Sequence, residues 1–260
     1  MNTVAPEAER FYRTSLGALE RSGVPFLMGG AYALHEYTGI VRDTKDLDVF
    51  CKHDNAPALL ATLQAAGYET VVAHPLWLGK AFCGDHLVDL IFGSGNGICT
   101  VDDGWFRHAI PCTAFGMSVR LIPPEEMIWS KSYVQDRERF DGADIAHIIR
   151  GRGRTLDWHR LLARMAGDWE ILLAHLLMFR FAYPSERDTV PAWLLRELGA
   201  RIRAQIATPP PPGRLCQGTL LSPYNYEIDV NEWGYEDARR RRSDGPVWRP
   251  EAERAHRGGR

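Results

Sequence analysis

The sequence predicts an α+β fold in which a mixed β-sheet with flanking helices is followed by a helical domain and an extended C-terminal tail. Two observations lead to this prediction. Apolar runs of strand length alternate with helical patterns up to about residue 122, and apolar residues at helical spacing dominate from there to about residue 208. Four prolines, 209–212, end the helical part. We therefore expect a first domain over 1–122, a helical domain over 123–208, and a Pro-rich linker with a partly disordered tail over 209–260.

The composition is that of an ordinary globular protein, with 45% hydrophobic and 25% charged residues in 260 positions. A chain of this length buries a core without disulfides or metal staples. The net charge of −2 argues against binding nucleic acid through overall charge. Five cysteines without a C-x-x-C pair favour reduced thiols, and no apolar run is long enough for a membrane span or a signal segment. We therefore expect a cytoplasmic protein with no membrane partner.

Local patterns predict the individual elements in chain order. Helical spacing predicts helices over 5–22, 57–66, 125–135, 139–150, 156–166, 169–182 and 190–206. Short apolar runs predict strands over 24–28, 68–73, 77–83 and 86–92, and a hairpin over 109–121. The stretch 94–105 is predicted to be a loop that borders the pocket, with Asp102 and Asp103 as turn residues. The aromatic content of 220–235 suggests that this segment packs on the body, and the chain should be mobile or disordered from Arg239 onward.

The stretch 26–52 carries the clearest functional signal in the chain. The strand over 24–28 runs directly into Gly29 and Gly30, and a short helical pattern follows up to Gly39. Because glycine has no Cβ, backbone amides at such a helix N-terminus can approach an anion closely. The order of strand, two glycines and helix therefore predicts a phosphate site, with an ordinary tight turn as the alternative.

Three aspartates are predicted to lie on strands beside these glycines. Asp46 and Asp48 follow a polar turn and stand two residues apart in an apolar strand, so both side chains point to the same face. Asp89 lies in the apolar run HLVDLIF, where an unpaired carboxylate is costly to bury. On adjacent strands the three would form a carboxylate cluster that needs a cation. The alternatives are a solvated strand face for the first two and an exposed sheet edge for Asp89.

The order of these motifs resembles the DNA polymerase β-like nucleotidyltransferase superfamily. In that superfamily a G-[GS] turn opens a helix, a D-x-D follows on the next strand, and a third carboxylate sits on a later strand of the same sheet. The first half is most similar to aminoglycoside and lincosamide nucleotidyltransferases. That likeness is carried by the run Gly29-Gly30-Ala31, Gly39, Arg42, Thr44, Asp46, Leu47 and Asp48. The resemblance implies a nucleotidyltransferase-like mixed sheet.

A later segment, KSYVQDRERFDGADIAHII, is similar to abortive-infection nucleotidyltransferase toxins. Their K-then-[RK]D-x-x-D arrangement places Lys131 at the NTP phosphates and Asp141 and Asp144 near the site. This chain departs from the pattern, because Phe140 precedes the motif aspartate and Arg139 stands one position further back. The alternatives are a surface lysine and acidic residues that favour the positive end of a helix dipole.

The resemblance implies a Mg²⁺-dependent nucleotidyltransferase that moves an NMP from an NTP to a hydroxyl acceptor and releases pyrophosphate. Its catalytic residues would also be the ligands of two Mg²⁺ ions, namely Asp46, Asp48 and Asp89. The NTP donor would be held by Gly29, Gly30, Arg42, Thr44 and Lys131. For Arg42, an exposed position without a ligand is the alternative.

The sequence leaves the acceptor and the base of the NTP open. A small molecule, a tRNA 3′ end and a protein side chain all fit, and a tRNA-type acceptor is the one role expected for nucleic acid. A non-catalytic or antitoxin-like binding partner on the same scaffold is the main alternative, and it leaves room for a partner protein. The three carboxylates count against it, because a pure binding module has no need to bring them together. A metal-dependent nuclease would use the carboxylates but not the glycine turn.

Overall fold

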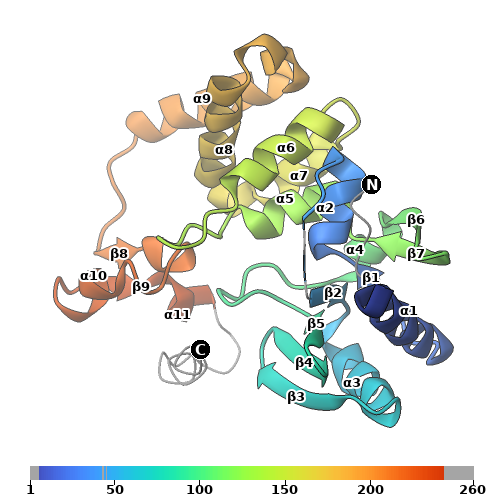
Figure 1. Cartoon of the computed structure of the whole chain (residues 1–260). Coiled ribbons are helices and arrows are strands. Elements are labelled where there is room, and N and C mark those ends of the chain that lie inside the picture. The colour runs from blue at the N-terminus through green and yellow to red at the C-terminus, as the bar shows by residue number, and fades with distance from the viewer. Residues whose placement is uncertain (1–5, 43, 45, 243–260) are drawn as a thin grey trace.

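The computed structural model describes residues 6–42, 44 and 46–242 of the chain. Its main sheet contains the strands β1 (Leu27–Met28), β2 (Asp46–Phe50), β3 (Glu69–His74), β4 (Leu78–Cys83), β5 (His86–Ile91), β6 (Ile110–Ala114) and β7 (Met117–Leu121). The strand order is β3-β4-β5-β2-β1-β7-β6 (Figure 1). Two of the neighbouring pairs, β2 with β5 and β1 with β7, are parallel and the others are antiparallel. The predicted mixed sheet and hairpin are confirmed.

The two faces of the central strands differ in chemistry. Along β2, Leu47 and Val49 are fully buried, and they alternate with Asp46 and Asp48. Leu47 lies opposite Val88 of β5, which is also fully buried. Because side chains alternate along a strand, the apolar row faces the core and the aspartates face the other side.

Helices α1 (Pro6–Arg21) and α3 (Ala56–Ala65) cover the apolar face. They pack against each other and against β3, β4 and β5, at the lower right of Figure 1. Their fully buried leucines are Leu16, Leu19, Leu59 and Leu63. The 3.6-residue spacing of these leucines is what predicted both helices.

Helix α2 (Gly30–Thr38) lies directly after the two glycines and packs on β2 and on the helical region. That region contains α5 (Pro124–Lys131), α6 (Gly142–Arg152), α7 (Trp158–Arg164), α8 (Trp169–Ala182) and α9 (Ala192–Ile206), stacked above the sheet in Figure 1. One continuous cluster of buried apolar residues runs from Ala8 to Leu198. Sheet and helices therefore share a core across the predicted boundary at residue 122.

Helix α5 ends at Lys131, four residues before the predicted end at 135, and α6 (Gly142–Arg152) begins three residues after the predicted start at 139. The stretch between them forms a turn in which the Asp136 N–H donates to the Arg139 carbonyl over 2.9 Å. The sequence DRERFDG offers no apolar face to bury there, so helix propensity alone does not extend either helix.

The predicted loop over 94–105 contains the start of a short helix, α4 (Asp103–Arg107). Asp102 is its N-cap, and its carboxylate accepts a hydrogen bond of 2.7 Å from the Gly104 N–H. The same carboxylate pairs with Arg164 of α7 at 2.6 Å. Asp102 is therefore a cap that ties α4 to the helical region, which the prediction of a turn residue missed.

The C-terminal segment is extended but contains short elements. Strand β8 (Leu215–Cys216) pairs with β9 (Glu236–Asp237), and α10 (Glu227–Asn231) and α11 (Ala238–Arg242) flank them. The start of the segment contacts the body, where the Asn96 amide donates to the Leu220 carbonyl over 2.9 Å. Trp233, further along the segment predicted to pack on the body, is 53% exposed. The first residues of the stretch predicted to be mobile or disordered from Arg239 onward lie in α11. The rest of that stretch lies outside the described residues. No helix in the described ranges is long and apolar enough to cross a membrane.

Candidate active site

The register of β2 and β5 brings the predicted aspartates to one face of the sheet. Asp48 stands directly opposite Asp89, and Asp46 lies two residues before Asp48 on the same strand. Neighbouring strands lie about 4.8 Å apart, and register partners of a parallel pair point to the same side. The structure therefore brings the three carboxylates, two on β2 and one on β5, to the same face of the sheet.

Asp48 is the most perturbed carboxyl of this group. Burial raises its pKa to about 7, and the negative charges of Asp89 and Asp46 add to the rise. The cations of Lys131 and Arg139 act in the opposite direction. A carboxyl crowded by like charges releases its proton readily once a divalent cation neutralises the group.

The two glycines are required by close approach to β2. Gly30 has φ +55°, and a Cβ there would lie 1.6 Å from Oδ2 of Asp48. A Cβ on Gly29 would lie 2.3 Å from the Phe50 ring, and the Gly29 N–H donates to the Asp48 carbonyl over 2.9 Å. The Asp48 carboxylate thus lies against the bare backbone at the start of α2. Any side chain at Gly30 would displace Asp48 as well as crowd a bound phosphate, so such a variant does not separate the two roles.

Lys131 lies at the C-terminal end of α5 in a buried network. Its ammonium group contacts Oδ2 of Asp141 at 2.7 Å and Oδ2 of Asp144 at 2.8 Å. Arg42 pairs with the same Asp144, with Nη1 donating to Oδ2 over 3.0 Å and Nη2 to Oδ1. Lys131 is 17% exposed, so it is not a solvated surface lysine. Asp141 is the N-cap of α6 and Asp144 lies in its first turn, so a favourable interaction with the helix dipole stays an alternative for these two acids. The contacts of Lys131 and Arg42 in this structure are to carboxylates, and contact with phosphate stays a prediction for both.

Thr44 shapes the turn that leads into β2. Its hydroxyl accepts a hydrogen bond from the Asp46 N–H and is within 3.2 Å of the Asp46 carbonyl. The Tyr12 hydroxyl donates to the Thr44 carbonyl over 2.9 Å and anchors the turn to α1. These contacts give Thr44 a structural role, and its predicted contact with nucleotide stays a prediction.

One further residue beside the three aspartates, Lys80, was not predicted from the sequence. Its ammonium group lies 2.8 Å from Oδ1 of Asp89. A signal was present, because β4 and β5 are joined by a two-residue turn, Gly84-Asp85, with Gly84 at φ +60°. A two-residue hairpin fixes the register, and counting back from it sets Lys80 opposite Asp89. Arg139 is a second cation near the carboxylates, and it lies 3.3 Å from Asp141.

The chemistry of these donors fits a divalent cation, although a metal site is not fully assembled. Carboxylate oxygens are the ligands that Mg²⁺ prefers. The pKa of Asp48 is raised first by burial and then by the negative charges of Asp89 and Asp46, and a bound cation would offset both effects. Within residues 6–42, 44 and 46–242, no three His, Cys, Asp or Glu side chains are grouped to hold a metal ion. Asp46 and Asp48 are the residues that would hold one.

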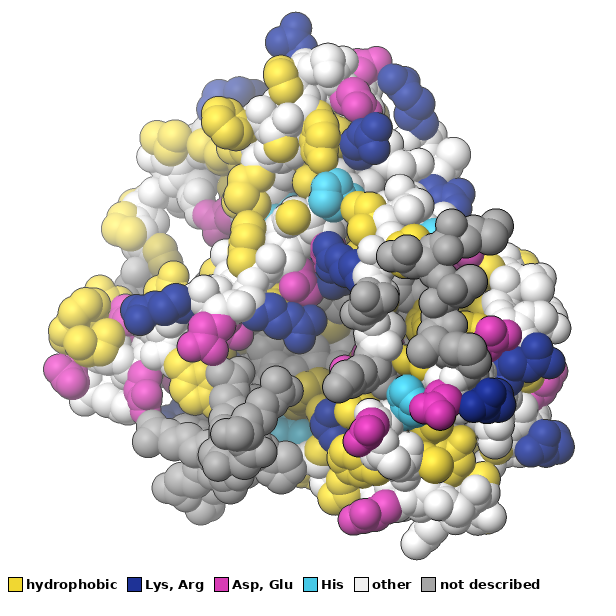
Figure 2. Space-filling model, viewed as in Figure 1, with side chains coloured by type: hydrophobic (Ala, Val, Ile, Leu, Met, Phe, Trp, Pro, Cys, Tyr) yellow, Lys and Arg dark blue, Asp and Glu magenta, His cyan; other side chains and the backbone are white. Residues whose placement is uncertain are grey.

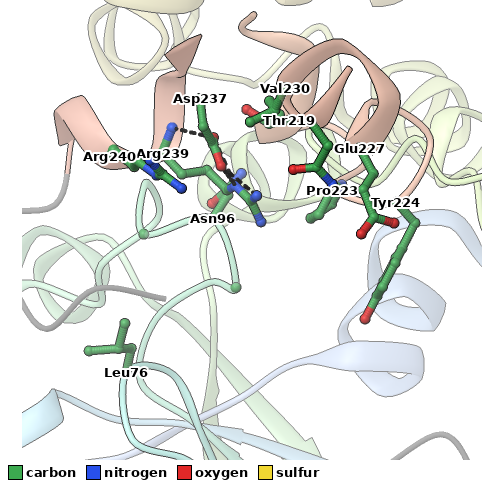
Figure 3. Close-up of a pocket in the computed structure, with 13 residues that line it drawn as sticks. Leu76, Asn96, Thr219, Pro223, Tyr224, Glu227, Val230, Asp237, Arg239 and Arg240 are labelled. Carbon is green, nitrogen blue, oxygen red and sulfur yellow. Dashed lines mark hydrogen bonds and ion pairs between the residues drawn. The ribbon is translucent and has the colours of Figure 1, made fainter. Parts of the chain in front are cut away.

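Two further views of the surface bear on ligands. Figure 2 shows Lys and Arg side chains interspersed with Asp and Glu over the face it draws, so this face presents no broad basic area for nucleic acid. Figure 3 shows a separate pocket between the loop at Asn96 and the C-terminal segment, lined in part by Tyr224, Glu227 and Asp237. None of the three site aspartates lines that pocket.

The chain is similar in fold to several nucleotidyltransferases of known structure. ANT(2")-Ia in complex with adenylyl-2"-tobramycin aligns at 19% identity and a TM-score of 0.43, over 67% of this chain and 98% of that one. The lincosamide antibiotic adenylyltransferase LnuA, lincomycin-bound, aligns at 17% identity and a TM-score of 0.40, over 56% and 98%. An antigenic nucleotidyltransferase-like protein from Paracoccidioides brasiliensis aligns at 16% and 0.43, over 72% and 95%.

No protein-family model matches the chain, and the search of curated proteins returned no match. At these identities and TM-scores, the likeness concerns the arrangement of helices and strands. It transfers no activity, ligand or partner to this chain.

Proposed function

We propose that the chain is a Mg²⁺-dependent nucleotidyltransferase that moves an NMP from an NTP to a hydroxyl acceptor and releases pyrophosphate. The observation that carries the proposal is the crowding of Asp48, which lies in register with Asp89 and against the bare backbone of Gly30. The three carboxylates are each half-buried and share one face of the sheet, which a fully solvated strand face would not give. A tight turn alone does not require a carboxylate as close to Gly30 as that of Asp48. The site combines groups for a cation and for phosphate within a few residues.

Each residue has a role that follows from its place. Asp46 and Asp48 would hold Mg²⁺, which neutralises the triphosphate when bound. Backbone amides at the start of α2, other than the Gly29 N–H that donates to the Asp48 carbonyl, would bind phosphate oxygens. Asp89 would accept the proton of the acceptor hydroxyl as the new O–P bond forms and the bond to pyrophosphate breaks. Lys131 would contribute its positive charge to the phosphates in exchange for Asp141 or Asp144.

The acceptor is left open among a small molecule, a tRNA 3′ end and a protein side chain. The five cysteines are free thiols, which suits the reducing cytoplasm as the compartment. A non-catalytic or antitoxin-like scaffold is the second candidate. It is favoured by one observation, namely that Lys80, Lys131 and Arg42 are already engaged by carboxylates in the absence of ligand.

The test is incubation with each of the four α-labelled NTPs and Mg²⁺, with cell extract as the source of acceptors. Transfer of label that is lost in Asp48→Asn, together with Mg²⁺–NTP binding measured by calorimetry, supports the enzyme. Binding of Mg²⁺–NTP without transfer from any NTP favours the scaffold. Absence of both overturns the proposal.

A further inference from the structure

A row of four residues crosses the sheet from β4 to the end of β1. Lys80 is the register partner of Asp89, and Asp89 is the register partner of Asp48. Gly29 closes the row through its hydrogen bond to the Asp48 carbonyl. Register partners point their side chains to one face, so the row sets an ammonium group and two carboxylates in line beside the glycine turn.

Lys80 is held firmly at the end of this row. Its side chain is 26% exposed and that of Asp89 16%, and the Nζ–Oδ1 distance is 2.8 Å. The tight turn at Gly84 fixes which residue of β4 meets Asp89, so the pair is set by the backbone rather than by a free side chain. Oδ2 of Asp89 makes no hydrogen bond to any residue that the structure describes.

The carboxylates around the site fall into two groups. Three of them pair with a lysine or arginine, namely Asp89, Asp141 and Asp144. Asp46 and Asp48 make no ion pair with any residue in the described parts of the chain. The uncompensated negative charge is therefore confined to β2, while the charge of Asp89 on β5 already has a cation.

We propose that the Lys80 ammonium takes the place of a second metal ion beside Asp89, so that the site holds one divalent cation, on Asp46 and Asp48. This inference rests on the proposed function and revises the expectation of two Mg²⁺ ions. An ammonium group at 2.8 Å from Oδ1 and a metal ion on the same carboxylate would repel each other at close range. Lys80 is then a positioning residue, which holds Oδ1 of Asp89 and leaves Oδ2 for the proton of the acceptor hydroxyl.

The experiment counts bound Mn²⁺ in the full chain by electron paramagnetic resonance, with inorganic tripolyphosphate as a probe that does not depend on the unknown base. Two ions in a two-metal site lie about 4 Å apart and couple magnetically, which distinguishes them from one ion. We expect about one uncoupled Mn²⁺ per chain in the wild type, and about two coupled ions in Lys80→Met and Lys80→Gln. Lys80→Arg keeps the charge and should return the count to about one.

Lys52→Met is the matched control, because Lys52 also pairs with an aspartate, Asp103, but on an exposed surface. It should leave the count at about one. The role of Lys80 is overturned, and the proposed function is not, by either of two results. The first is two coupled ions in the wild type, and the second is a single ion in both Lys80→Met and Lys80→Gln when these variants are folded. The number of Mn²⁺ ions bound by the wild type tests the role of Lys80 even where a Lys80 variant does not fold. The proposed function itself fails if the wild type binds no Mn²⁺, or if Asp48→Asn binds Mn²⁺ as well as the wild type does.

Discussion

Replacing Asp48 by Asn should stabilise the metal-free protein at neutral and alkaline pH. The folded-state pKa of Asp48 is raised to about 7, chiefly by burial and then by Asp89 and Asp46. The unfolded chain releases the same proton near pH 4. Between these values the folded state binds more protons than the unfolded state, so this group contributes stability at low pH that is lost as the pH rises towards 7. Asn has almost the same shape and carries no charge at any pH.

The magnitude follows from the distance between the two pKa values. A rise from 3.8 to about 7 destabilises the ionised folded protein by at most roughly 4 kcal/mol. Movement of Lys131 or Arg139 towards Asp48 reduces this, so we expect a gain of about 1–4 kcal/mol for Asp48→Asn at pH 8 and almost none at pH 4. In a chain of this size, that corresponds to a rise in Tm of roughly 2–10 °C at pH 8.

The assay is thermal unfolding of both proteins from pH 4 to pH 8, in chelator and in Mg²⁺. Mg²⁺ should raise the Tm of the wild type at pH 8 and have little effect on Asp48→Asn, because the variant lacks the ionised ligand. Asp54→Asn is the control, since its carboxylate is fully exposed and should change neither dependence. A variant that is less stable than the wild type at pH 8, or a difference that does not vary with pH, would refute the reasoning.

Three further predictions follow from the same site and its support. Asp89→Asn should retain Mg²⁺–NTP affinity by calorimetry and lose about 10²–10⁴-fold in turnover, because its role is towards the acceptor proton; full turnover would contradict that role. Lys131→Ala should raise the NTP concentration needed for half-maximal rate more than it lowers kcat, and an unchanged NTP titration would exclude a phosphate contact. Arg160→Met should cost roughly 3–5 kcal/mol in urea unfolding, because it leaves the fully buried Glu126 carboxylate without its closest cation; a loss below about 1 kcal/mol would show that Arg164 replaces it.

Local patterns were enough to predict the backbone around the candidate site. Strand β1, the glycine pair and α2, over 27–38, and the alternation that turns Asp46 and Asp48 to one face are encoded within a few residues. The strand predicted over 24–28 is shorter in the structure, where β1 is Leu27–Met28. Asp89 was found because a carboxylate inside an apolar strand needs a partner. The register that sets it opposite Asp48 was not predicted, since a parallel pair is joined by a long crossover and local sequence does not fix its alignment.

The pairing of each cation with a particular carboxylate could not be predicted for a related reason. Lys131 lies near Asp141 because the chain turns back between α5 and α6, where helical spacing had suggested longer helices. Arg42 reaches Asp144 across a separation of 102 residues. Such pairs depend on how sheet and helices pack, and the sequence offers no periodicity that signals them. Lys80 is the exception, because the two-residue hairpin turn fixes the register of β4 and β5. Counting residues back from that turn identifies Asp89 as the partner of Lys80.

The distribution of charge links these findings to how the site would bind its ligands. The three paired carboxylates hold Lys80, Lys131 and Arg42 in place, so these cations are ordered before any ligand arrives. A phosphate chain that recruits Lys131 must displace Asp141 or Asp144, and the exchange leaves buried negative charge that a nearby cation must offset. Arg42 and Arg139 are placed to do so, since each already contacts one of these two aspartates. A divalent cation at Asp46 and Asp48 would offset the remaining excess, which is why we expect metal and triphosphate to bind together rather than separately.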